Sequence, residues 1–109
     1  MFKIFASTLG GAALSLTLAA HAAPGSITIK IDNFTYNPDT LVVPVGTTIT
    51  WVNEDDVPHT AVADDHKTFR SKPLDTDDRY SFTFASPGVY PYFCSIHPHM
   101  TAKIIVKAS

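Results

Sequence analysis

The chain has 109 residues with 45% hydrophobic and 17% charged side chains, which is the composition of an ordinary globular protein. This length predicts one domain and argues against a multidomain organisation. The formal net charge is only −2 and the sequence has no basic run, so we expect no nucleic-acid partner.

The first 22 residues have the features of a signal peptide for export. Lys3 precedes an apolar run over residues 4–20, and Ala20-His21-Ala22 provides a small-x-small cleavage site. We predict cleavage after Ala22, which leaves residues 23–109 as the mature domain. A membrane anchor is the alternative. However, glycine, serine and threonine interrupt a run that is already near the lower limit of about 17 residues for a span, so we expect no span in the mature protein.

The chain after the predicted cleavage site consists of apolar segments separated by turn residues. The turns recur about every 8 to 12 positions, a spacing typical of β-sandwiches. The segment Ser26–Asp32 predicts the first strand, because Ile27, Ile29 and Ile31 would lie on one face. Residues 33–40 predict a bend, which the sequence Asn-Pro-Asp marks.

Two further strands are predicted before the middle of the chain. Residues 41–45 form the first, and Pro44 confines it to a sheet edge or a bulge because proline has no amide hydrogen to donate. Residues 47–53 form the second, which carries Trp51, the only tryptophan.

The middle of the chain has a weaker pattern. We expect the acidic turn at residues 54–56 to be a solvated loop without a dedicated role. Residues 57–62 follow as an apolar segment, and residues 64–78 are polar and irregular. Phe69 and Leu74 are predicted to anchor this irregular region in the core.

The last third of the chain contains the clearest strand pattern. Residues 79–84 alternate, with aromatic residues on one face and hydroxyl residues on the other. Residues 89–93 lead into a loop, and residues 102–107 form a closing strand with Ile104 and Val106 pointing inward. Together the segments predict an all-β sandwich of about seven to eight strands in two packed sheets.

Cys94 is the only cysteine in the chain, so no internal disulfide can form. In the oxidising compartment that export implies, an unpaired thiol is open to oxidation unless it is buried or bound to a metal. No cysteine lies near the predicted signal peptide, and we expect no lipid attachment there.

The loop around Cys94 contains further metal-binding side chains. His97 and Met100 follow in the spacing Cys-x-x-His-x-x-Met, which lets three side chains converge if the loop curls. A thiolate, an imidazole and a thioether favour copper in a trigonal site of two histidines and one cysteine with a weak axial methionine. The loop supplies one histidine, so the second must come from elsewhere.

The chain contains four other histidines. His21 leaves with the predicted signal peptide, and His66 lies in a charged segment typical of a solvated loop. His99 is expected to point away from the place where the loop side chains converge. A lone histidine at the position of His59 is more often structural than a ligand, yet an antiparallel sandwich can bring this position to the same end as Cys94.

Several segments together resemble the cupredoxins, the type I blue copper proteins, and in particular their amicyanin and pseudoazurin branch. The matching segments are residues 48–53 (Thr-Ile-Thr-Trp-Val-Asn), 57–59 (Val-Pro-His), 87–90 (Pro-Gly-Val-Tyr), 94–100 (Cys-Ser-Ile-His-Pro-His-Met) and 103–106 (Lys-Ile-Ile-Val). They extend over most of the predicted mature domain. The short spacing from Cys94 to His97, followed directly by Pro98, is similar to the amicyanin form.

The resemblance implies that His59, Cys94 and His97 are equatorial copper ligands and that Met100 is the axial ligand. It also implies a Greek-key sandwich that binds one copper ion and shuttles single electrons in the periplasm as Cu(I) and Cu(II). On this basis we expect a monomeric electron carrier rather than an enzyme. Its expected partners are redox proteins, such as a dehydrogenase or a c-type cytochrome.

Three further expectations concern the surroundings of the site. Many family members have asparagine where this chain has Thr60, whose hydroxyl has less reach to tie the ligand loops together. In the amicyanin-like branch the loop histidine can protonate, which predicts that His97 makes the reduction potential rise as pH falls. Acidic residues are expected to steer a basic partner toward an apolar patch around His97. This patch would consist of Pro58, Ile96, Pro98 and Met100.

The same residues allow other functions. A copper carrier or sequestering protein would use identical ligands for storage or delivery. A hydrolase with Cys94 as nucleophile and His59 or His97 as base lacks an evident third group and leaves Met100 unexplained. Zinc is a poor fit because methionine is rarely its ligand and structural zinc sites contain more cysteines.

Overall fold

The computed structural model describes residues 25–108, and the predicted signal peptide lies outside them. The described residues form eight strands and contain no helix, which confirms the all-β prediction. No helix that could cross a membrane is therefore found in this part of the chain. The strands are β1 (Ser26–Asp32), β2 (Thr35–Asn37), β3 (Thr40–Pro44), β4 (Thr48–Asn53), β5 (Val62–Ala63), β6 (Arg79–Thr83), β7 (Gly88–Phe93) and β8 (Thr101–Lys107).

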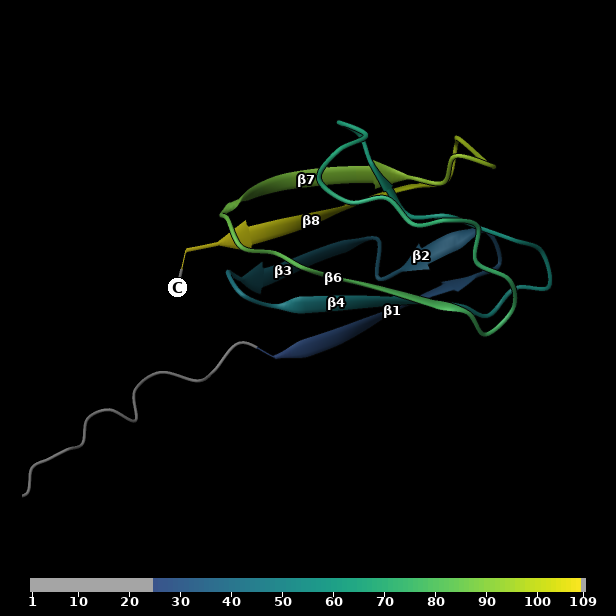
Figure 1. Ribbon diagram of the computed structural model, residues 1–109, viewed down its shortest axis with the longest axis horizontal. Helices are drawn as coiled ribbons and strands as arrows, with labels where there is room; N and C mark the ends of the chain where they lie inside the picture. The colour runs from purple at the N-terminus through teal and green to yellow at the C-terminus, as the bar shows by residue number, and fades with distance from the viewer. Residues whose placement is uncertain (1–24, 109) are drawn as a thin grey trace, which may run out of the picture.

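The strands form two four-stranded sheets that lie face to face (Figure 1). The first sheet has the order β2-β1-β4-β6, and the second has the order β3-β8-β7-β5. Each sheet contains one parallel pair, β1 with β4 and β3 with β8, while the other pairs are antiparallel. This arrangement buries the inner face of each sheet against the other, as expected for a sandwich.

The β3 strand lies at the edge of its sheet, as predicted from Pro44. It pairs only with β8, and its last pair joins Pro44 to Lys107. An edge position leaves one side of the strand without ladder partners, so the missing amide hydrogen of proline removes no hydrogen bond.

The β2 strand was not predicted, because residues 33–40 were expected to form a bend. Asn33 and Phe34 both have positive φ angles, 53° and 60°, and reverse the chain so that Thr35 pairs with Asp32. The pairing brings Tyr36 next to Ile31 and buries the tyrosine ring, which is 2% exposed. Three residues are too short a segment for alternation to identify a strand.

Most predicted core residues are buried, with one exception. Ile29 and Ile31 are fully buried, whereas Ile27 near the start of β1 is 36% exposed. Phe69 and Leu74 are each 2% exposed and anchor the irregular segment as predicted.

Trp51 joins the two sheets at the centre of the core. It lies in β4 and is fully buried, and its indole Nε1 donates a hydrogen bond of 3.1 Å to the hydroxyl of Tyr92 in β7. Its ring also stacks on Phe69, with centroids 5.2 Å apart. The tryptophan therefore links β4 of the first sheet to β7 of the second sheet, at a residue two positions before Cys94.

Candidate metal centre

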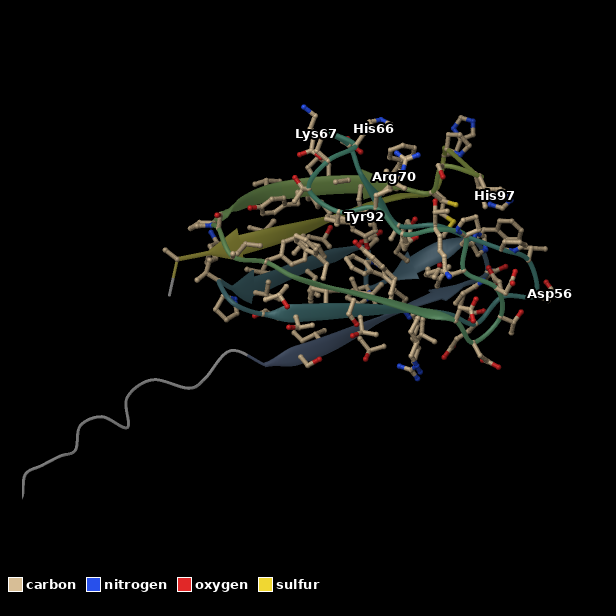
Figure 2. The ribbon with its side chains drawn as sticks, viewed as in Figure 1. Asp56, His66, Lys67, Arg70, Tyr92 and His97 are labelled. Carbon is tan, nitrogen blue, oxygen red and sulfur yellow. The ribbon has the colours of Figure 1, made fainter. Side chains whose placement is uncertain are left out.

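Three of the predicted ligands meet at one end of the sandwich. The donor atoms of His59, Cys94 and His97 all lie within 4.8 Å of one another. The sulfur of Cys94 is 3.8 Å from Nδ1 of His59 and 3.7 Å from Nδ1 of His97. His59 and Cys94 are fully buried and His97 is half-buried. Figure 2 shows His97 at the end of the molecule opposite to the end where β8 finishes.

The distances between the donor atoms fit one metal ion that all three side chains would bind together. Bond lengths of about 2.3 Å to sulfur and about 2.05 Å to nitrogen require the two donors to lie less than about 4.4 Å apart. The observed separations of 3.7 and 3.8 Å satisfy this condition.

The loop between β7 and β8 curls as its spacing predicted. The amide of Met100 donates to the carbonyl of His97 at 2.9 Å, and the amide of Cys94 donates to the carbonyl of Met100 at 3.0 Å. These two bonds close the loop on itself. They turn Met100 into the core, where its side chain is 6% exposed, at the base of the loop that holds Cys94 and His97.

His59 reaches the site from the segment between β4 and β5. Its backbone pairs with Leu74 in an isolated bridge, with amide-to-carbonyl distances of 3.1 and 2.7 Å. The bridge holds His59 against the irregular segment that Leu74 anchors. The strand that follows is shorter than the predicted apolar segment and covers only Val62–Ala63.

Asp55 orients the ring of His59, which corrects the expectation that the acidic turn is only a solvated loop. A carboxylate oxygen of Asp55 lies 2.8 Å from Nε2 of His59. Because an ionised carboxylate can only accept, Nε2 of His59 is the donor, and in the neutral imidazole this leaves the lone pair of Nδ1 on the side of Cys94. Glu54 and Asp56 are exposed, as predicted for the rest of the turn.

The hydrogen bonds of Asp55 keep its carboxyl group ionised. Burial by itself would raise the pKa of this carboxyl, but hydrogen bonds from the amides of Phe34 and Asn33 and from the ring of His59 bring the pKa below its usual value. The two amide bonds are 2.9 and 2.6 Å long. The carboxylate therefore joins the turn between β1 and β2 to the ring of His59.

Buried Asn53 holds the segment that carries Asp55. Its side-chain oxygen accepts from the amide of Asp55 at 2.9 Å, and its side-chain nitrogen donates to the carbonyls of Val57 and Leu74 at 2.9 and 2.8 Å. Asn53 is fully buried, so these bonds are shielded from water. These bonds hold the path from the end of β4 to His59.

Thr60 ties the two ligand segments together despite its short side chain. Its hydroxyl accepts from the amide of Ser95 at 2.7 Å and lies 2.9 Å from the Ser95 hydroxyl. The Thr60 amide points at the sulfur of Cys94 at 3.4 Å, and the Thr60 carbonyl accepts from the hydroxyl of Tyr36 at 2.5 Å. The reach of a hydroxyl is thus sufficient here.

We expect Thr60→Val to loosen this connection. Valine has nearly the same shape but cannot accept from the Ser95 amide, so the free energy of unfolding should fall by about 1–2 kcal/mol. Urea denaturation of the metal-free protein measures this loss. The control is Thr60→Ser, which keeps the hydroxyl and should recover most of the stability. Equal stability of the valine and serine variants would contradict the assigned role of the hydroxyl.

The apolar surface around His97 differs in one residue from the prediction. Ile96 is 44% exposed, and Pro58 and Pro98 are also exposed, but Met100 is buried and cannot contribute. Phe34, which was not predicted, is 48% exposed and takes its place beside the histidine.

His66 and His99 are exposed, and neither belongs to the cluster of metal-binding side chains within residues 25–108. This agrees with the sequence prediction.

The fold and the site define a small β-sandwich protein with a candidate site for one metal ion, which two imidazoles and one cysteine sulfur form. Residues 5–106 match the sequence model of a protein family, the cupredoxin-like domain. The chain therefore belongs to this family.

Individual relatives agree with this assignment. The chain is similar to amicyanin from Paracoccus denitrificans, with 33% identity over 93 residues that cover 82% of this chain and 71% of the relative. Among solved structures, a purple cupredoxin from Nitrosopumilus maritimus has 38% identity and a TM-score of 0.69, covering 74% of this chain and 99% of the other. The Cu(I) form of an amicyanin variant has 32% identity and a TM-score of 0.71, covering 82% and 89%.

Proposed function

We propose that the protein is a periplasmic single-electron carrier that holds one copper ion through His59, Cys94, His97 and Met100. The observation that carries this proposal is the cluster of two imidazole nitrogens around the sulfur of Cys94, with donor separations of 3.7 and 3.8 Å. This donor set is the one that type I copper sites use. The similarity to amicyanin in its Cu(I) form supports the choice of metal.

The chain supplies a rigid set of ligands, which suits electron transfer. A bound copper ion supplies the one-electron couple between Cu(I) and Cu(II). Asp55 and Asn53 fix His59, while the hydrogen bonds within the loop fix Cys94 and His97. Because these side chains are held in place by the fold, little movement accompanies a change of charge at the site.

His97 is the proposed exit for the electron. It is the half-buried member of the cluster, whereas His59 and Cys94 are fully buried. Exposed Phe34 and Ile96 lie with it on the surface. A partner that docks on this small apolar area would come close to a ligand without opening the site, as suits the small interfaces of redox encounters.

The expected partners are redox proteins such as a dehydrogenase or a c-type cytochrome. Figure 2 places Asp56 at the same end of the molecule as His97, and Glu54, two residues earlier in the chain, is also exposed. This distribution favours a partner with a basic docking surface. Partner reduction rates should then fall with increasing ionic strength.

The burial of the site favours an electron carrier over the two alternatives. A hydrolase would need Cys94 to reach a substrate, yet this residue is fully buried. A carrier that delivers copper would need ligands that release it readily, whereas His59 is buried and fixed by Asp55. We therefore expect the protein to act as an electron carrier and not as an enzyme, and we propose that it does so as a monomer.

We expect Met100→Gln to retain copper and to lower the reduction potential, because an amide oxygen is a harder donor than a thioether and favours Cu(II). A decrease on the order of 60 mV would correspond to a tenfold change in the equilibrium of a one-electron couple. Voltammetry of the copper-loaded proteins measures the shift. Val42→Gln introduces the same amide at an exposed site on β3 and should leave the potential unchanged, so equal potentials in all three proteins would count against Met100 as a ligand.

Electron self-exchange tests the proposed function. Mixtures of the oxidised and reduced copper protein should show NMR line broadening that reports rapid exchange of electrons between molecules. A rigid site with an accessible histidine predicts fast exchange. Negligible exchange, together with release of copper on reduction, would support the copper-delivery alternative instead.

A further inference from the structure

Phe34 contacts both histidines of the candidate metal centre. Its ring meets the ring of His59 at a centroid distance of 5.1 Å and an angle of 87°, and the ring of His97 at 4.9 Å and 84°. The two imidazoles are themselves 4.9 Å apart. One aromatic ring therefore lies edge-to-face with both imidazoles, on the side where His97 approaches the surface.

The backbone at Phe34 has a conformation that a large side chain rarely adopts. Its φ angle is 60° and that of Asn33 is 53°, in the left-handed region where asparagine and glycine are the usual residues. A tight turn alone would be satisfied by glycine at either position. Phe34 is also 48% exposed, so burial in the core does not account for a large side chain at this position. The contacts of its ring with the two imidazoles do account for it.

Asp55 enforces this conformation. Its carboxylate accepts from both amides of the turn, Asn33 at 2.6 Å and Phe34 at 2.9 Å. Asp55 is fixed in turn by Asn53, which accepts from its amide, and by Thr76, which donates to its carbonyl at 2.6 Å. The carboxylate that orients His59 thus also places Phe34 over the imidazoles.

The ring of His97 is held by fewer side-chain contacts than the ring of His59. The ring of His59 is held by Asp55 through Nε2. Among residues 25–108, the only side chain within hydrogen-bonding distance of the His97 ring is Cys94, whose sulfur faces Nδ1. Without Phe34, the ring of His97 would have water on its outer side and greater freedom to rotate about χ1 and χ2.

We propose that Phe34 is a positioning residue that holds the His97 ring in its ligating orientation and excludes water from both imidazoles. Asp55 sets Phe34 in place through the two amides of the turn. The inference rests on the proposed function, because Phe34 would position a residue that the proposal identifies as a metal ligand.

The test compares Phe34→Ala, Phe34→Leu and Phe34→Tyr with Val42→Ala, a control at another exposed apolar residue, 55% exposed on β3. Each protein is loaded with zinc, and the rate of zinc loss to an excess of chelator is measured. Ring-carbon NMR relaxation of His59 and His97 is recorded on the same samples. Loss of an outer contact to a metal ligand typically lowers metal affinity about 10–100-fold.

We expect Phe34→Ala to release zinc about tenfold faster or more, with increased motion of the His97 ring and little change at His59. Phe34→Leu should show an intermediate effect, and Phe34→Tyr should recover the parent rate because the ring is retained. Val42→Ala should match the parent protein. The inference is overturned if Phe34→Ala and Phe34→Leu release zinc at the parent rate, or if the His97 ring is equally rigid in all variants.

Two features keep this test separate from the proposed function. Zinc has no redox chemistry, so the release rate and the ring motion report only on positioning. If the copper-loaded parent lacks an intense thiolate band, the electron-carrier proposal fails whatever the zinc results are. If that band is present while the Phe34 variants behave like the parent with zinc, only the role of Phe34 is wrong.

Discussion

Cys94→Ala should abolish the intense visible absorption expected of the copper-loaded protein. That absorption requires charge transfer from a thiolate to copper, and Cys94 is the only thiol in the chain. The remaining donors, two imidazoles and a thioether, give no comparable transition. An absorption titration with Cu(II), followed by dialysis and copper analysis, measures both the band and the number of ions retained.

The fold itself should survive this substitution. A buried cysteine packs as a small hydrophobic side chain, and its replacement by alanine leaves only a small cavity. Circular dichroism should therefore be unchanged, and Ser86→Ala, in an exposed turn remote from the site, serves as the matched control. If the intense colour persists in Cys94→Ala, the assignment of the thiolate as a ligand is wrong.

Trp51→Ala should have the largest effect on stability. The indole is fully buried, stacks on Phe69 and donates the hydrogen bond that joins the sheets through Tyr92. Removing a buried aromatic side chain costs about 3–5 kcal/mol in the free energy of unfolding. Because small domains are stable by only about 5–15 kcal/mol, this variant should unfold at a much lower denaturant concentration.

Two further variants separate packing from hydrogen bonding at Trp51. Trp51→Phe retains most of the ring but loses the donor to Tyr92, so its loss should be smaller than that of the alanine variant. Val42→Ala removes an exposed side chain and should change the stability by less than about 0.5 kcal/mol. A loss below about 1 kcal/mol in Trp51→Ala would show that the tryptophan does not hold the sheets together.

The strands with strong alternation could be predicted from the sequence, but their partners could not. The patterns over residues 26–32 and 79–84 agree closely with β1 and β6. Nothing local in the sequence shows that β1 runs parallel to β4, or that the short β2 pairs with β1. These pairings depend on the turn at Asn33 and Phe34 and on contacts between distant parts of the chain.

The ligand loop could also be predicted, because three donors within seven residues must converge when the loop curls. His59 is different, since its position alone is equally typical of a structural histidine, and the family resemblance was needed to select it. The structure then places it 3.8 Å from the sulfur of Cys94.

The residues that support the ligands were not predicted. Asp55 lies in an acidic turn whose composition is typical of a solvated loop, and its role depends on a turn more than twenty residues away. Phe34 and Tyr36 likewise act on His59, His97 and Thr60 across the fold. Such contacts become visible only when the sheets and loops are assembled.

Spectroelectrochemistry of the copper-loaded protein tests the central claim most directly. One copper per chain should give an intense band in the red part of the visible spectrum, which disappears when one electron is added and returns fully on reoxidation, with the copper retained throughout. A protein that shows no such band, or that loses its copper on reduction, would contradict the account of this chain as a single-electron carrier.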